Sequence, residues 1–205
     1  MRNKRWEFSD ERKVCGIDID GVLNYYPLPW MEFLIRELQC PPYNFRLPKK
    51  KDVDLNWIKD RVPYNMYRQL KYYWRKSEEK AEMECREYAP EFLAALKKAE
   101  YEIVVLTARP IHQIRSLYRL TIDWLENNNL RYDFIISGKD KHITIIQEVP
   151  NLKFMIEDHR DVANRVARWG YKVYLMANDH NDGDLHPNVN RIYGFSEILK
   201  YEGLL

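Results

Sequence analysis

Several features are scarce in this 205-residue chain, and their scarcity narrows its class. The three cysteines, Cys15, Cys40 and Cys85, lie far apart without a C-x-x-C pair, which argues against a disulfide scaffold and against a zinc site. No apolar stretch approaches the roughly 20 residues that a membrane-spanning helix needs. The net charge is only +2, so overall charge makes no strong case for binding to nucleic acid or membrane.

The first 13 residues, "MRNKRWEFSDERK", are polar throughout and lack the apolar segment of a signal peptide. Together with the widely spaced cysteines, this predicts a protein of the reducing cytoplasm. No internal repeat or low-complexity tract is visible. The length suits one domain with a sizeable core, or a core with a small accessory lobe.

Short apolar runs alternate with helix-like segments over most of the chain. This alternation predicts an α/β fold, with a parallel, Rossmann-like sheet and flanking helices. Helical patterns cover residues 89–100, 110–129, where a proline suits the first turn, and 161–170, which ends in a glycine. The apolar runs expected to form buried strands cover 13–19, 102–107, 132–137, 153–158 and 171–176.

The long interval between the first two strands breaks this alternation. Residues 25–98 read as several helices separated by proline-containing turns, and they hold about half of the aromatic residues. We interpret residues 25–88 as a small helical insert after the first strand. The α/β core is then formed by residues 1–24 and 89–205.

Two aspartates mark the end of the first strand. Asp18 and Asp20 are two residues apart, so on a strand their side chains would leave the same face, and Gly21 then allows a sharp turn. At the carboxyl end of a parallel strand, that face opens where α/β sheets bind ligands. A divalent cation would neutralise such a carboxylate pair. The alternative is that both aspartates only make hydrogen bonds in a turn.

The other strand ends also carry reactive groups. Thr107 and Arg109 follow the second strand, Lys139 and Lys141 the third, and an acidic pair within 156–161 the fourth. Each group also has a purely structural alternative. Thr107 could cap a helix, the two lysines could be solvated surface charges, and the acidic pair could begin a helix. The four strand ends thus carry, in order, two acids, a hydroxyl with a cation, a lysine and two acids. This order is far less expected by chance than any one of the groups.

These motifs resemble those of a known family. "DIDGVL" (18–23), "LTARP" (106–110), Lys141 and "IEDHRD" (156–161) are similar, in order, to the four motifs of the haloacid dehalogenase (HAD) superfamily of phosphohydrolases. The helical insert falls where that family carries its C1-type cap. The motif set looks most like the 5′(3′)-deoxyribonucleotidase branch, and polynucleotide 3′-phosphatase domains are also similar.

The resemblance implies catalytic roles for two aspartates. Asp18 would be the nucleophile that forms an aspartyl-phosphate, and Asp20 would protonate the leaving group and later deprotonate water. The implied substrate-binding residues are Thr107, Ala108, Arg109 and Lys141. Lys139 competes with Lys141 for the third-motif role, and "KDK" favours Lys141.

The resemblance also implies a Mg²⁺ cofactor. Its ligands would be the Asp18 carboxylate, the Asp20 backbone carbonyl and Asp158, with Glu157 acting through a metal-bound water. The family often has two aspartates in the fourth motif, where this chain has Glu157 and Asp158. Asp161 would orient the acidic pair.

The implied function is hydrolysis of small phosphomonoesters, with (deoxy)nucleoside monophosphates as the expected substrates. The alternatives are a 3′- or 5′-phosphatase acting on nucleic-acid ends and a nucleotide-binding module without turnover. Aromatic residues of the insert would either stack on a base or form the insert's own core. They include Tyr25, Tyr26, Trp30, Trp57, Tyr67, Tyr72, Tyr73 and Trp74. Residues 178–186 are interpreted as a polar surface turn.

Overall fold

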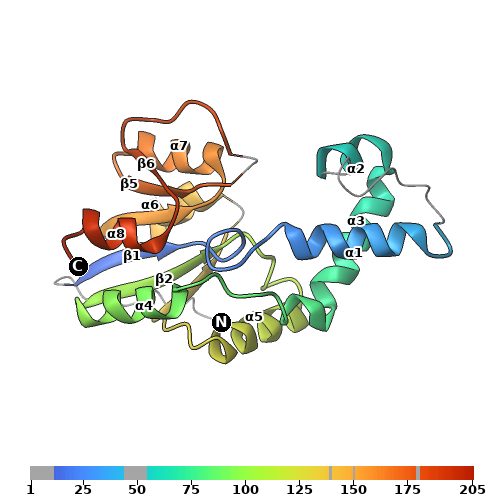
Figure 1. The fold of residues 1–205 in the computed structure, drawn as a ribbon, viewed down its shortest axis with the longest axis horizontal. Helices are drawn as coiled ribbons and strands as arrows, with labels where there is room; N and C mark the ends of the chain where they lie inside the picture. The colour runs from blue at the N-terminus through green and yellow to red at the C-terminus, as the bar shows by residue number, and fades with distance from the viewer. Residues whose placement is uncertain (1–11, 44–54, 139, 150, 179–180) are drawn as a thin grey trace.

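A six-stranded parallel sheet forms the centre of the computed structural model (Figure 1). The structure describes residues 12–43, 55–138, 140–149, 151–178 and 181–205. The strand order is β3-β2-β1-β4-β5-β6, and every neighbouring pair is parallel. The expected α/β fold is therefore confirmed. The strands are β1 (Lys13–Ile17), β2 (Tyr101–Thr107), β3 (Phe134–Ser137), β4 (Leu152–Glu157), β5 (Lys172–Met176) and β6 (Val189–Ile192).

The two central strands are buried because helices cover both faces of the sheet. One face packs against α4 (Ala89–Lys98), α5 (Arg115–Asn127) and α8 (Phe195–Tyr201). The other face packs against α6 (Lys141–Glu148) and α7 (Arg160–Arg168). Alternate residues of β2 illustrate the two-residue period, since Val105 joins the first cluster and Leu106 the second.

A helical insert lies between β1 and α4 and extends to one side of the sheet (Figure 1). It contains α1 (Leu28–Gln39), α2 (Leu55–Arg61), α3 (Tyr64–Lys76) and the short 3₁₀ helix η2 (Glu78–Lys80). These elements share a hydrophobic cluster of their own, which includes Trp30, Leu34, Ile58, Leu70 and Trp74. A separate core of this kind allows the insert to fold as a small lobe. The described part of the chain has no helix long and apolar enough to cross a membrane.

The observed elements differ from the expected ones in several places. Helices α6 and α8 and strand β6 were not expected; β6 has only two buried apolar residues, Val189 and Ile192. Helix α5 begins at Arg115 and not at Pro110. The backbone N–H groups of Gln113 and Ile114 both bond to the Pro110 carbonyl in a turn, which delays the helix.

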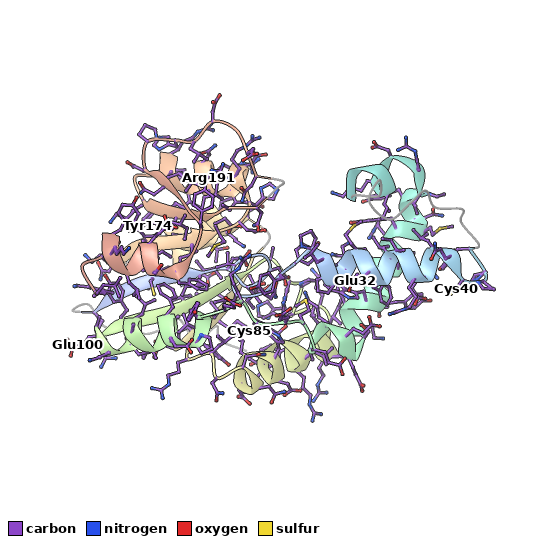
Figure 2. The ribbon with its side chains drawn as sticks, in the orientation of Figure 1. Glu32, Cys40, Cys85, Glu100, Tyr174 and Arg191 are labelled. Atoms are coloured by element: carbon purple, nitrogen blue, oxygen red, sulfur yellow. The ribbon has the colours of Figure 1, made fainter. Side chains whose placement is uncertain are left out.

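The three cysteines are free thiols. Figure 2 shows Cys40 at the far end of α1 and Cys85 near the junction of the insert and the sheet. Cys15 is buried in β1, where its thiol donates to the Glu102 carbonyl. The separation of these residues agrees with the expectation that no disulfide scaffold holds the fold.

Candidate active site

Three carboxylates gather where β1 and β4 end side by side. Asp18 follows β1, and its N–H donates to the Ile156 carbonyl of β4 at 3.0 Å. Glu157 is the last residue of β4, and Asp158 comes next. One carboxylate oxygen from each of Asp18, Glu157 and Asp158 lies within 4.8 Å of the others, and all three residues are buried. The adjacency of the two strands thus assembles an acidic cluster that the sequence divides between distant segments.

Lys141 enters this cluster from the first turn of α6. Its buried Nζ lies 2.6 Å from Asp18 Oδ2 and 2.9 Å from Glu157 Oε2. We refer to Asp18, Lys141, Glu157 and Asp158 as the acidic cluster. One ammonium group among three carboxylates leaves the cluster with excess negative charge, which favours binding of a further cation.

Burial perturbs the titration of the acidic cluster. Burial raises the pKa of Asp18 to about 7, and although Lys141 opposes the rise, the charge of Glu157 adds to it. Burial and the neighbouring Asp158 also raise the pKa of Glu157 against the effect of Lys141. Burial lowers the pKa of Lys141, but the carboxylates of Asp18 and Glu157 outweigh it and hold the pKa above its usual value. These directions describe a site that stabilises added positive charge.

Gly21 allows the backbone to approach Asp158 closely. Its φ of +86° lies in the left-handed region that favours glycine, and a Cβ atom at this position would come within 2.1 Å of Asp158 Oδ2. The turn also receives support from Asn24, whose Oδ1 accepts from the N–H of Gly21 at 3.1 Å. The glycine of the first motif is therefore required by both backbone conformation and space.

Asp20 has different partners from Asp18. Arg109 donates to it with two nitrogens, Nε to Oδ2 at 3.0 Å and Nη2 to Oδ1 at 2.5 Å. Lys80, the last residue of η2 in the insert, places Nζ 2.9 Å from Asp20 Oδ1. Because β1 ends at Ile17, both aspartates lie in the turn that follows it, and the expected placement on one strand face was wrong.

The cations around Asp20 determine its charge state. Burial would raise the pKa of Asp20, but Arg109 and Lys80 outweigh it and hold the pKa well below its usual range. Burial and the charge of Arg109 lower the pKa of Lys80 to about 7, and Asp20 limits the fall. Asp20 is therefore a carboxylate in this arrangement, and it bonds to Arg109 of the core and to Lys80 of the insert.

The second motif is organised around Arg109. Thr107 Oγ1 accepts from the Arg109 N–H at 3.1 Å, which closes a turn after β2. The Arg109 guanidinium also donates through Nη1 to Thr121 Oγ1 of α5, and the Arg109 carbonyl accepts from Ser137 Oγ of β3. Thr107 therefore closes a turn and does not cap a helix, because α5 begins only at Arg115. The same turn directs Arg109 to Asp20.

The structure brings most of the expected site residues together. Asp18, Lys141, Glu157 and Asp158 form the acidic cluster, and Asp20 with Arg109 lies on the adjoining turn. Ala108 is exposed, and Lys139 lies outside the described residues. Asp161 is exposed and pairs with Arg160, so nothing in the described contacts connects it with the acidic pair.

The donor set of the acidic cluster fits Mg²⁺. Carboxylate oxygens are hard ligands of the type that Mg²⁺ prefers, and a small cation needs them close together. Asp18, Glu157 and Asp158 meet both conditions, since their oxygens converge and the residues are buried. Within the cluster, Lys141 offsets the negative charge of Asp18 and Glu157.

Three polar residues of the site were not expected from the sequence. Lys80 joins Asp20 from the insert, and Asn24 Nδ2 also donates to Asp20 at 3.2 Å. Asn181 is buried, and its Nδ2 donates to the backbone carbonyls of Asp158 and Met176 at 2.7 Å each. The surface-turn interpretation of 178–186 is therefore wrong at this residue, and residues 179–180 lie outside the described chain. The polar "NDHNDGD" segment was the available signal for Asn181.

A cavity of about 530 Å³ lies near the turn that follows β1. It is lined by aromatic and polar residues that include Tyr25, Arg86, Tyr88, Tyr193 and Phe195. Arg86 connects it with the first motif, since its Nη2 donates to the Gly21 carbonyl at 3.2 Å. The acidic cluster is not part of its described lining, so the cavity adjoins the site without containing it.

Comparisons with known proteins agree with the motif resemblance. No protein-family model matches the chain. A nucleotidase of Clostridium acetobutylicum is 26% identical over 193 residues, which cover 92% of this chain and 92% of the relative.

Solved structures are similar at lower identity. A haloacid dehalogenase-like hydrolase, SP0104 of Streptococcus pneumoniae, gives a TM-score of 0.66 at 14% identity, over 93% of this chain and 98% of that one. YfnB of Bacillus subtilis, described as a HAD-hydrolase and solved with bound magnesium, gives 0.63 at 10% identity over the same shares. The resemblance expected from the four motifs is confirmed, and the chain has the fold of the HAD-like hydrolases.

Proposed function

We propose that the protein is a Mg²⁺-dependent phosphomonoesterase that acts on nucleoside monophosphates through an aspartyl-phosphate. The observation that carries the proposal is the buried convergence of Asp18, Glu157 and Asp158 around Lys141 at the carboxyl ends of β1 and β4. The nucleotidase name of the 26%-identical relative supports the choice of substrate.

In the first half-reaction, an Asp18 carboxylate oxygen attacks the phosphorus atom, and the bond to the leaving oxygen breaks. Lys141 lies against Asp18, where its ammonium group offsets negative charge on the phosphoryl oxygens. Thr107 offers a hydroxyl at the end of the neighbouring strand β2. Asp20 gives a proton to the leaving oxygen.

In the second half-reaction, Asp20 takes a proton from water, and the water oxygen displaces Asp18 from phosphorus. The low pKa of Asp20 suits this step, because the carboxylate form is the base. The first half-reaction needs the protonated form, which Arg109 and Lys80 oppose. Movement of Lys80 away from Asp20 is therefore part of the proposed cycle.

Mg²⁺ would be held by Asp18 and Asp158 with the Asp20 backbone carbonyl, and Glu157 would bind through water. When bound, the cation neutralises negative charge on the ester and on the acidic cluster. Lys141 would orient Asp18, since it bonds to both Asp18 and Glu157.

The test is phosphate release from p-nitrophenyl phosphate and from a panel of 5′- and 3′-nucleoside monophosphates, with and without Mg²⁺. We expect Mg²⁺-dependent release that falls by about 10³-fold or more in Asp18→Asn, because the amide is not a nucleophile. Activity that survives this substitution would contradict the mechanism. Faster release from phosphorylated oligonucleotides than from mononucleotides would instead assign the enzyme to nucleic-acid ends.

A further inference from the structure

The insert places more positive charge beside Asp20 than that carboxylate can neutralise. Asp20 already receives two hydrogen bonds from Arg109 and one from Lys80. A second lysine of the insert, Lys71 of α3, is partly buried and donates to the Tyr26 hydroxyl at 2.8 Å. Among the described residues, no carboxylate lies within ion-pair distance of Lys71.

The two lysines share an aromatic enclosure. Lys71 Nζ lies 4.7 Å from the ring centroid of Tyr26, 4.3 Å from that of Trp30 and 4.8 Å from that of Trp74. Lys80 Nζ lies 5.5 Å from Tyr26 and 4.2 Å from Trp74. Because both ammonium groups flank the same two rings, they lie near each other, and their like charges repel.

The electrostatic cost of this arrangement is visible in Lys71. Burial and the charge of Lys80 hold the pKa of Lys71 well below its usual range. The rings attract cations through their π faces, yet they supply no negative charge. A nearby anion would satisfy both ammonium groups.

The two tryptophans of this enclosure each carry a further hydrogen-bond donor. The indole Nε1 atoms of Trp30 and Trp74 are buried and have no acceptor among the described residues. The simple alternative is that Lys71 and Lys80 only cover the apolar core of the insert with their side-chain stems. That alternative leaves Lys71 with the Tyr26 hydroxyl as its acceptor and leaves two indole N–H groups without an acceptor among the described residues, whereas an anion would supply several.

The enclosure of Lys71 and Lys80 lies next to the residue that would act on the leaving group. Lys80 contacts Asp20, the residue that exchanges a proton with the leaving oxygen in the proposed reaction. A different cation, Lys141, lies next to the proposed nucleophile, since it bonds to Asp18 and Glu157. Lys141 would therefore contact the phosphoryl group of the ester. The enclosure therefore lies toward the part of the ester that departs.

We propose that Lys71 and Lys80 bind a second anionic group, a phosphate or a carboxylate, on the leaving group of the substrate. This inference rests on the proposed phosphomonoesterase function and narrows its substrate class to esters whose alcohol carries a negative charge. Hydrolysis breaks only the scissile phosphorus–oxygen bond, and the alcohol leaves with its anionic group intact. A nucleoside 3′,5′-bisphosphate is one such ester.

The test compares matched esters in the full-length protein with Mg²⁺. The pairs are 4-carboxyphenyl phosphate with phenyl phosphate, and adenosine 3′,5′-bisphosphate with adenosine 5′-monophosphate. We expect kcat/KM to be about tenfold or more higher for the charged member, through KM, because the ammonium groups bind it as a charge-assisted pair. A gain in the first pair alone identifies a carboxylate, and a gain in the second alone a phosphate.

Substitution of Lys71 should remove the preference. In Lys71→Met, the ratio of kcat/KM within a pair should fall toward one, and Lys71→Arg should restore most of it. The matched control is Lys76→Met, since Lys76 is an exposed lysine of the same helix that lies 5.1 Å from the Tyr72 ring centroid. The control should keep the wild-type ratio, and thermal unfolding of each variant checks that it folds.

The outcomes separate the inference from the proposed function. Equal kcat/KM within both pairs in the wild-type protein would overturn the inference and leave the phosphatase intact. Absence of Mg²⁺-dependent release from every ester would contradict the function. In that case, calorimetric binding of the paired esters to Asp18→Asn still decides the inference, because equal Kd values for charged and uncharged members would overturn it.

Discussion

The two aspartates of one short turn lie in opposite electrostatic surroundings. Asp18 belongs to the acidic cluster, where three carboxylates converge around Lys141. Asp20, two residues later, is bonded by Arg109 and Lys80, with Lys71 close to the latter. We refer to Asp20, Arg109, Lys80 and Lys71 as the basic cluster. One turn thus joins a cluster with excess negative charge to a cluster with excess positive charge.

This difference in surroundings suits the different roles that we propose for the two aspartates. In the acidic cluster, burial and neighbouring carboxylates raise the pKa of Asp18, and a bound cation would relieve the repulsion. In the basic cluster, Arg109 and Lys80 hold Asp20 as a carboxylate, and a bound anion would compete with it for those cations. The core supplies the acidic cluster, whereas the insert supplies both lysines of the basic cluster.

Removing the cation of the acidic cluster should have the largest effect. In Lys141→Met, two buried carboxylates, Asp18 and Glu157, lose their ammonium partner, so we expect kcat to fall about 10²–10³-fold. The metal-free protein should also lose about 3–5 kcal/mol of unfolding free energy, because buried charges are left unpaired. Phosphate-release kinetics and urea unfolding measure the two effects.

The matched control is Lys153→Met, which removes an exposed lysine from β4, the strand that carries Glu157. It should leave both kcat and the unfolding midpoint near their wild-type values. A Lys141→Met protein with wild-type kcat would show that the acidic cluster does not act on the phosphoryl group.

Altering the backbone between the clusters should have a smaller effect. Gly21→Ala would place a Cβ atom against Asp158, so we expect weaker Mg²⁺ activation and kcat/KM lower by about 10–100-fold. Gly170→Ala is the control, because Gly170 has a φ of +90° but has no atom within 4 Å of the added Cβ. Both variants should lose about 1–3 kcal/mol of stability through backbone strain. Equal kcat/KM in the two variants would show that the contact with Asp158 is unimportant.

The pH dependence of stability should differ in sign between the two clusters. The pKa of Asp18 in the folded protein is about 7, above its ordinary 3.8, so Asp18 favours the folded state at low pH. The metal-free protein should lose this stability as the pH rises from about 4 to 7. The pKa of Asp20 is below the same ordinary value. Asp20 therefore stabilises the fold above pH 4, and this contribution is lost as the pH falls further.

Urea unfolding at several pH values tests this contrast. Asp18→Asn should flatten the decline between pH 4 and 7 and raise the unfolding free energy at pH 7 by about 1–2 kcal/mol. Asp20→Asn should lower the unfolding free energy at pH 7, since Arg109 and Lys80 lose their charged partner. Changes of the same sign in both variants would refute the electrostatic difference between the clusters.

The acidic cluster was largely predictable from the sequence, whereas the basic cluster was not. Asp18, Lys141, Glu157 and Asp158 each follow a strand or begin the next helix, and parallel strands bring such positions to one edge of a sheet. The strands themselves are apolar runs that only a buried sheet accommodates. Local patterns and one topological rule therefore indicated these positions, whereas the choice of Lys141 over Lys139 depended on the family resemblance.

Lys80 and Lys71 could not be predicted in this way, because their positions depend on how the insert packs. Both are lysines among other charged and aromatic residues, and helical spacing does not distinguish a buried ammonium from a solvated one. Trp30 and Trp74 are buried in the insert's core, which was one of the two locations that the sequence left open for them. The position of Asn181 likewise depends on how a loop folds, because its hydrogen bond to the Asp158 carbonyl joins residues that are 23 positions apart in the sequence.

The most direct test of the account is to trap the covalent intermediate. The protein is mixed with Mg²⁺ and a fast-leaving aryl phosphate, quenched in acid within one turnover, digested, and examined by mass spectrometry. We expect one phosphoryl group on Asp18, and more of it in Asp20→Asn, because that variant lacks the base for hydrolysis. Mg²⁺-dependent phosphate release with Asp18 unmodified, or with the phosphoryl group on another residue, would contradict the account.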